Sequence, residues 1–281
     1  MGTPKFDVSS NHPHMEKVKN LFSPYLRQHI KALLYTRPTF NPFFKYRRDK
    51  VFSDMEESGQ IGDIPIFIVS FNRLSYLKEL ISRLEQLGKH NIFIIDNAST
   101  YPPLLEYYQT LHYPVIYTNS NYGHRVFWEC PLLEEYRHNF YILTDPDVIP
   151  IESCPLDFIE KFFEILKRYP YINKVGFSLK IDDLPEGRAN QINEERMWMI
   201  PEKHGDGFCA SIDTTFALYV PDSIARSRLF SDAIRTNAPY QARHLPWYKQ
   251  TEDLTDEDMY YSEHRLHWIS TFDPVKAVRH V

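Results

Sequence analysis

Cysteine and glycine are both scarce in this chain of 281 residues. The three cysteines, Cys130, Cys154 and Cys209, lie far apart, so their spacing matches neither a metal site nor a disulfide framework. This usage is typical of a reducing compartment, and we expect a cytoplasmic protein. Only nine glycines are present, and the segment SFNRLS at residues 70–75 contains none. A glycine-rich phosphate loop is therefore not expected there.

Long apolar runs are also missing. The longest run, IPIFIVSF at residues 64–71, is far too short to cross a bilayer, and the first ten residues contain no apolar run. We therefore expect neither a membrane span nor a signal peptide. The length of the chain is sufficient for a large hydrophobic core.

Charge is unevenly distributed along the chain. Residues 1–50 carry an excess of Lys and Arg, whereas the remainder is acidic and the overall net charge is −5. Two explanations are equally compatible with this asymmetry: peripheral contact of residues 1–50 with the inner face of a membrane, or packing of this segment on the acidic body. The acidic body opposes nucleic-acid binding, so no nucleic-acid partner is expected.

A polar stretch near residue 60 separates a basic helical segment, residues 1–60, from the body of the protein, residues 61–281. Residues 61–150 alternate between apolar segments and helical patterns, which predicts a parallel sheet covered by helices. The expected strands are residues 64–71, 91–97, 114–119 and 139–145. The expected helices are residues 74–88 and 102–111, with partly helical structure in 126–136.

The pattern changes after residue 150. An amphipathic helix is predicted at residues 155–170, and strands are predicted at residues 174–179 and 211–220. The overall prediction is an α/β fold with a mixed sheet, in which residues 61–150 form a Rossmann-like half and residues 151–281 a divergent half.

Polar residues follow each of the four strands expected in residues 61–150. Because the carboxyl ends of parallel strands meet at one edge of the sheet, these residues predict a ligand site at that edge. They are Ser70, Asn72 and Arg73; Asp96, Asn97, Ser99 and Thr100; Asn119, Asn121, Gly123, His124 and Arg125; and Asp145 and Asp147.

The segment YILTDPDVI places Asp145 and Asp147 directly after the fourth strand. Two carboxylates at this spacing can share Mg²⁺ or Mn²⁺, which prefer oxygen ligands and leave positions open for phosphate. The alternative is a solvated turn that Asp145 caps and Pro146 shapes. The polar ends of the three preceding strands favour the metal site.

These motifs together resemble a glycosyltransferase of the GT-A fold, close to the family 2 type. The matching segments are VSFNR at residues 69–73, DNAST at 96–100, NYG at 121–123 and the Asp-x-Asp of Asp145 and Asp147. The resemblance covers roughly a third of the chain. It implies a nucleotide-diphospho-sugar donor, with a UDP-sugar favoured, Mn²⁺ or Mg²⁺ as cofactor, and a glycan or lipid-linked acceptor.

The resemblance also assigns roles to residues. Asp96 would face the nucleobase and ribose, Asp145 and Asp147 would hold the metal and the diphosphate, and the first-strand segment would flank the nucleotide. The full set predicted to bind the nucleotide-sugar is Ser70, Asn72, Arg73, Asp96, Asn97, Asn121, Arg125 and Asp145.

An inverting transferase needs a carboxylate that takes the proton of the attacking hydroxyl. Asp213, which interrupts an apolar segment, is one candidate. Asp253 and Asp258 are the others, because family 2 members often place the base in a Glu-Asp pair on a later helix. The pairs are Glu252-Asp253 and Glu257-Asp258, and both lie in the acidic run TEDLTDED. A solvated helix start is the expectation for at least one of them.

His244 is the preferred third metal ligand or diphosphate contact, with His264 and His267 as competitors. Arg243 could bind phosphate. Trp247 and Tyr248 could stack on an acceptor sugar, although core packing is the commoner role of aromatic residues.

Three other classes compete with the transferase. A haloacid-dehalogenase-like phosphatase would use Asp145 as nucleophile and Asp147 as acid/base, but its motif normally lies on the first strand. A sugar-phosphate nucleotidyltransferase would need a glycine-rich loop after the first strand. A catalytically inactive module that binds nucleotide-sugar is the third class, and the intact pair of aspartates argues mildly against it.

Overall fold

The structure is a computed structural model that describes residues 42–170, 172–198, 205–212, 216–223 and 233–265. Its helices are α3 (Pro42–Ser58), α4 (Leu74–Gln86), α5 (Pro102–Tyr108), α6 (Val126–Glu129), α7 (Phe158–Arg168), α8 (Ala189–Trp198) and α9 (Asp256–His264). Its strands are β1 (Ile66–Ser70), β2 (Ile92–Asp96), β3 (Val115–Tyr117), β4 (Tyr141–Thr144), β5 (Val148–Pro150), β6 (Lys174–Leu179), β7 (Gly207–Cys209), β8 (Ala217–Tyr219) and β9 (Ala233–His244).

The strands form a single mixed sheet in the order β3-β2-β1-β4-β8-β6-β9-β5, with β7 paired to β9. The first four strands of this order are parallel to one another, and β8 lies antiparallel to both β4 and β6. β9 runs parallel to β6 and antiparallel to β5 and β7. The predicted α/β class with a mixed sheet is therefore confirmed.

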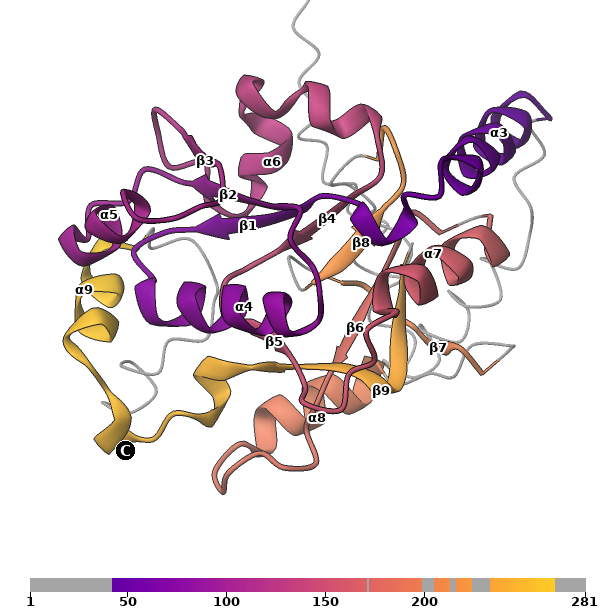
Figure 1. Cartoon of the computed structure of the whole chain (residues 1–281). Coiled ribbons are helices and arrows are strands. Elements are labelled where there is room, and N and C mark those ends of the chain that lie inside the picture. The colour runs from indigo at the N-terminus through magenta and orange to yellow at the C-terminus, as the bar shows by residue number, and fades with distance from the viewer. Residues whose placement is uncertain (1–41, 171, 199–204, 213–215, 224–232, 266–281) are drawn as a thin grey trace, which may run out of the picture.

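Helices cover both faces of this sheet (Figure 1). Helix α4 buries Leu77, Leu80, Ile81 and Leu84, whose helical spacing places them on one face. Helix α7 packs into the same core, and α6 contributes to a second core on the other face, around β1, β2 and β4. Each fully buried Phe of these cores, such as Phe162, contributes about 1.5–3 kcal/mol through its apolar burial.

The helices and strands of residues 61–147 agree closely with the prediction, and so do α7 and β6. Two differences appear after residue 147. The strand expected at residues 211–220 is observed only at β8, and residues 213–215 lie outside the described part of the chain. Strands β5, β7 and β9 were not predicted; β9 includes Asn237 and Pro239 and shifts register opposite Phe177 and Ser178.

Helix α3 belongs to the predicted N-terminal segment and packs on the body. Phe52 is 3% exposed and contacts Phe140 and Phe163, each with ring centroids within about 5 Å. Arg48 donates a hydrogen bond of 2.7 Å to the carbonyl oxygen of Leu166. This packing agrees with the second explanation for the basic segment as far as residues 42–58 are concerned; residues 1–41 lie outside the described part.

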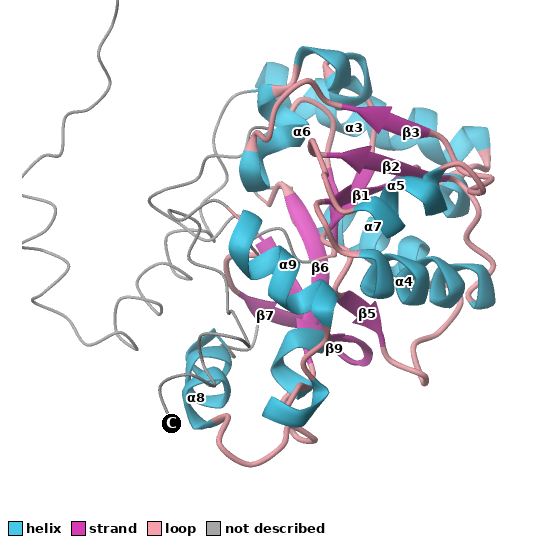
Figure 2. Ribbon diagram, turned by 90° about the vertical axis from the view of Figure 1, so that its left-hand side faces the viewer, coloured by secondary structure: helices cyan, strands magenta, loops and turns pink. Residues whose placement is uncertain are grey.

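No helix among the described residues is both long and apolar enough to cross a membrane. Helix α9 lies across the carboxyl ends of the parallel strands and close to the start of α4 (Figure 2). This placement brings the C-terminal part of the described chain to the edge where the sequence predicts a site.

Candidate functional site at the carboxyl edge of the sheet

The candidate site has two ends. We call the first the β1–β2 end, formed by Asn72, Asp96, Asn97 and Asn121. We call the second the β5–β9 end, formed by Asp147 and His244. Both sets of residues lie in loops or strand ends at the same edge, as the alternation of strands and helices predicts.

At the β1–β2 end, the amide side chains build the loops. Asn72 has a φ of 53° and accepts hydrogen bonds from the backbone N–H groups of Thr100 and Tyr101, at 2.7 and 2.9 Å. Asn97 donates to the side chain of Asn121 and to a backbone carbonyl, both at 3.0 Å, and accepts from the N–H of Tyr122. These contacts hold the second and third strand-end loops together.

Asp96 is 4% exposed at the end of β2. Its carboxylate accepts hydrogen bonds from the hydroxyl of Tyr108 at 3.1 Å and from the N–H of Ser99 at 3.3 Å. Burial raises the pKa of Asp96, and the bonds from Ser99 and Tyr108 oppose that rise only in part. The Tyr108 hydroxyl oxygen also lies 3.0 Å from the Ser70 hydroxyl, which can donate to it, so both predicted residues share one buried partner.

Arg73 and Asp258, predicted respectively as a nucleotide contact and as a base, form a buried ion pair with each other. The guanidinium and carboxylate lie 2.6 Å apart, and the two side chains are 5% and 0% exposed. Lys249 donates to the same carboxylate at 2.5 Å, and Thr255 forms a capping box with Asp258 at the start of α9.

These partners control the protonation of Asp258. Burial raises its pKa, but the bonds from Lys249 and Thr255 and the charge of Arg73 outweigh burial and lower the pKa to about 2. A carboxylate this acidic is a poor proton acceptor at neutral pH. The arrangement therefore fits a structural role for Asp258 better than the predicted role as base.

The other candidate bases are placed differently. Asp253 is exposed in a short 3-10 turn, Thr251–Asp253, and its carboxylate accepts from the N–H of Gln250 at 2.9 Å. The pair Glu252 and Asp253 is thus solvated, as expected for at least one pair of the acidic run, whereas Glu257 and Asp258 are buried. Asp213 lies outside the described residues.

At the β5–β9 end, strand pairing brings His244 next to the Asp-x-Asp segment. His244 pairs with Val148 across the antiparallel ladder, and the Leu245 N–H donates to the carbonyl oxygen of Asp147 at 2.9 Å. His244 Nε2 then lies 3.7 Å from Asp147 Oδ2. Asp145 is half-buried two residues before Asp147.

The imidazole of His244 is held against Trp247 in an edge-to-face contact of 4.9 Å. Burial lowers the pKa of His244, and the charges of Asp147 and Glu195 oppose this. Its Nδ1 atom is buried and has no hydrogen-bond partner among the described residues. A neutral imidazole beside a carboxylate, too far for a hydrogen bond, leaves room for a shared cation.

Asp147 and His244 are spaced so that they could share a divalent cation. Two ligands bound cis to such an ion at its usual metal–oxygen or metal–nitrogen distance lie about 3 Å apart, so the observed 3.7 Å needs only a small adjustment. Within the described ranges, however, no three side chains of the His, Cys, Asp and Glu types are already gathered as a ready cage. The residues present therefore fit an open site with few protein ligands, as Mg²⁺ commonly has.

The remaining candidates contact other residues of the protein. Arg125 forms a half-exposed pair with Glu129 at 2.9 Å. His264 stacks on Tyr260 at 3.9 Å within α9, and His267 lies outside the described residues. The Tyr248 hydroxyl donates to Asp183 at 2.7 Å.

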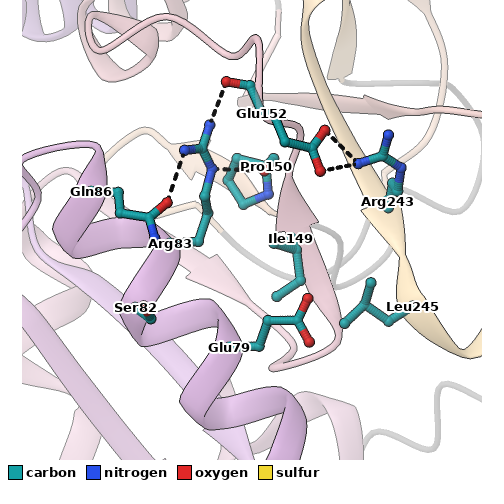
Figure 3. A pocket seen from close by; sticks show the side chains of 9 residues that line it. All are labelled: Glu79, Ser82, Arg83, Gln86, Ile149, Pro150, Glu152, Arg243 and Leu245. Carbon is teal, nitrogen blue, oxygen red and sulfur yellow. Dashed lines mark hydrogen bonds and ion pairs between the residues drawn. The ribbon is translucent and has the colours of Figure 1, made fainter.

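Arg243 points away from His244, as strand alternation requires, and lines a cavity of about 300 Å³ between α4, β5 and β9 (Figure 3). It donates two bonds to Glu152, at 2.8 and 2.7 Å, and also bonds Asp183. Across the cavity, Arg83 donates to the backbone carbonyls of Pro150, Ile151 and Glu152. These bonds hold the segment after β5 in place. They thereby support the pairing of β5 with β9, which brings Asp147 close to His244.

Sequence reasoning missed Tyr76 and Lys249 near this edge, and it considered Glu257 only as the neighbour of Asp258 in a Glu-Asp pair. Glu257 accepts from the N–H and hydroxyl of Ser75 and so caps α4 from a distant part of the chain. Tyr76 lies on the apolar face of α4, where the sequence pattern predicts a core residue. Lys249 belongs to none of the sequence motifs. Only the docking of α9 reveals them.

Comparison with known families and proteins adds no assignment. No protein-family model matches the chain, and no curated protein matches its sequence.

Proposed function

We propose that the protein is a metal-dependent glycosyltransferase of the GT-A type. It moves a sugar from a nucleotide-diphosphate donor, with a UDP-sugar favoured, to a hydroxyl of a glycan or lipid-linked acceptor. The observation that carries the proposal is the approach of His244 Nε2 to Asp147 Oδ2, 3.7 Å apart, at the carboxyl edge of a mixed sheet. The motif order noted in the sequence supports the same conclusion.

The chemistry follows from the groups at this edge. The acceptor oxygen forms a bond to the anomeric carbon as the bond from that carbon to the diphosphate oxygen breaks. A carboxylate takes the proton of the acceptor hydroxyl, and the diphosphate leaves with the bonding electron pair. A cation held by Asp145, Asp147 and His244 would supply positive charge to the leaving diphosphate.

The base is assigned by exclusion among the three candidates. Asp258 is neutralised by two cations and has a low pKa, and Asp253 is exposed in the acidic run. Asp213 is therefore the preferred base in this proposal, and its test is the loss of turnover in Asp213→Asn with unchanged donor binding.

The proposal is tested by turnover with a panel of UDP-sugars and GDP-sugars in the presence of Mn²⁺. Release of nucleoside diphosphate by the wild type, its loss in Asp147→Ala, and its retention in Asp253→Ala are the expected results. Release of inorganic phosphate from phosphomonoesters, with a phosphoryl group trapped on Asp145, would establish the phosphatase instead. Donor binding with no turnover for any acceptor class would indicate an inactive binding module.

A further inference from the structure

Tyr76 lies in the first turn of α4 and is only 5% exposed. Its hydroxyl oxygen is buried and has no hydrogen-bond partner in the described part of the chain. An unpaired buried hydroxyl is unfavourable, because it has lost its bonds to water without replacement. Such a group in a native protein calls for an explanation.

Two cations lie close to the Tyr76 ring. The guanidinium carbon of Arg73 lies 5.1 Å from the ring centroid, and the ammonium nitrogen of Lys249 lies 5.2 Å from it. Both cations are themselves fixed by Asp258, at 2.6 and 2.5 Å. The ring is therefore constrained, and its hydroxyl has little freedom to find a partner by rotation.

The charges of Asp147 and Arg73 act on both Tyr76 and His244. Burial raises the pKa of Tyr76; the charge of Arg73 opposes this, and those of Asp258, Asp147 and Glu257 add to it. Asp147 and Arg73 also act on His244, whose Nδ1 is the second buried atom at this edge without a partner among the described residues. Two unsatisfied polar atoms thus lie within electrostatic reach of the same carboxylate.

At two other buried tyrosines of this protein the hydroxyl is bonded. The Tyr108 hydroxyl bonds Ser70 and Asp96, and the Tyr141 hydroxyl bonds Ser223 at 3.0 Å and accepts from Trp128 at 3.2 Å. The fold can therefore satisfy a buried tyrosine hydroxyl, and at Tyr76 it does not. Its occurrence at the start of α4, at the carboxyl edge of the sheet and among the side chains of Arg73 and Lys249, points to a ligand.

We infer that the Tyr76 hydroxyl donates a hydrogen bond to an anionic oxygen of a diphosphate bound at Asp147 and His244. The inference rests on the proposed function for the identity of the ligand. A tyrosine phenol is protonated at neutral pH, so it can donate. Arg73 adds positive charge near this hydroxyl, whereas Asp258, Asp147 and Glu257 add negative charge, so the cation proposed at Asp147 and His244 would supply the charge that favours an anion there.

The test compares Tyr76→Phe with Tyr141→Phe as matched control, using Mn²⁺ with inorganic pyrophosphate and Mn²⁺ with UDP as probes. For Tyr76→Phe we expect a Tm at least as high as that of the wild type, since an unsatisfied hydroxyl is removed. We also expect roughly tenfold weaker binding of both probes, because a hydrogen bond to a charged group is lost. Tyr141→Phe should show the reverse, a lower Tm and unchanged affinity.

The outcomes separate the inference from the proposed function. Equal affinity of Tyr76→Phe and wild type for pyrophosphate, or a clear fall in its Tm, overturns the inference alone. If the wild type binds Mn²⁺-pyrophosphate but neither UDP nor GDP, the proposed function fails, while weaker pyrophosphate binding by Tyr76→Phe still supports the inference. A wild type that binds none of these probes overturns both.

Discussion

The β1–β2 end and the β5–β9 end of the same sheet edge carry similar polar residues but use them differently. At the β1–β2 end, the side chains of Asn72, Asp96 and Asn97 all have partners within the protein. At the β5–β9 end, His244 Nδ1 has none among the described residues, and Asp147 meets His244 at 3.7 Å, too far for a hydrogen bond. Saturated groups hold loops in place, whereas unsatisfied groups are available to a ligand.

This difference limits what the sequence motifs alone can predict. Polar residues after a strand predict the edge of the sheet at which a site forms, but they do not separate loop-building residues from ligand-binding ones. The distinction depends on what each side chain contacts. Variants at the β1–β2 end should therefore lose stability, whereas variants at the β5–β9 end should lose ligand binding.

The largest effect on stability is expected from Asp258→Ala, which leaves Arg73 and Lys249 in place without their shared carboxylate. Because Asp258 and Arg73 are almost fully buried, the free energy of unfolding should fall by about 3–5 kcal/mol. Chemical denaturation at neutral pH measures this. The matched control is Asp253→Ala, an exposed acid of the same acidic run, which should stay within about 0.5 kcal/mol of the wild type.

The pH dependence of stability tests the low pKa of Asp258. Its pKa in the folded state is about 2, below the ordinary value of 3.8 for an aspartate, so its stabilising contribution is present above about pH 4 and is lost as the pH falls toward 2. Asp258→Asn should therefore lose less Tm than the wild type between pH 4 and pH 2. Parallel Tm curves over this range would contradict the low pKa.

Asp147→Ala should give the largest effect on function. Removing a partner that only orients a metal ligand costs 10–100-fold, so removing the ligand itself should lower kcat/KM by at least about a hundredfold. The Tm should change little, since Asp147 is half-buried at a loop. Full activity of this variant without added metal would contradict the proposed chemistry.

Asn72→Ala is expected to act on stability alone. The change removes the acceptor for two backbone N–H groups and leaves a residue other than Gly or Asn at a φ of 53°, so unfolding should become easier by about 1–3 kcal/mol. The control is Asn91→Ala, where an exposed side chain donates one bond to the carbonyl of Asp63. If the folded Asn72 variant loses UDP binding with an unchanged Tm, the β1–β2 end binds ligand directly.

The smallest change in stability is expected from Arg125→Ala. Its pair with Glu129 is half-exposed, and such pairs contribute about 0.3–0.5 kcal/mol. The sequence predicts Arg125 as a nucleotide contact, so UDP affinity should fall several-fold while the Tm is unchanged. Unaltered affinity would indicate that Arg125 only forms a surface ion pair with Glu129.

Much of the fold could be predicted because residues 61–150 carry strong local patterns. The buried strands β1, β2 and β4 are continuous apolar segments, and α4 has a regular helical stripe. Strand β9 lacks such a pattern, since its twelve residues mix polar, aromatic and proline positions and pair with three strands. Its register is decided by tertiary pairing, which local sequence does not encode.

The site was predictable only in part, for a similar reason. Asp147 and His244 were both selected from the sequence, and the structure brings them together. The pairing of Arg73 with Asp258 spans 185 positions and depends on the docking of α9, so the sequence instead suggested separate roles for the two residues. Tyr76 was hidden because an aromatic residue on an apolar helix face gives no polar signal.

The central claim is that the β5–β9 end binds a divalent cation together with a nucleoside diphosphate. Isothermal titration of the wild type with UDP and with GDP, each with and without Mn²⁺, tests it most directly. The account predicts binding of one nucleotide, UDP in preference, that requires Mn²⁺ and disappears in Asp147→Ala. Failure of the folded protein to bind either nucleotide, or equal binding with and without Mn²⁺, would contradict it.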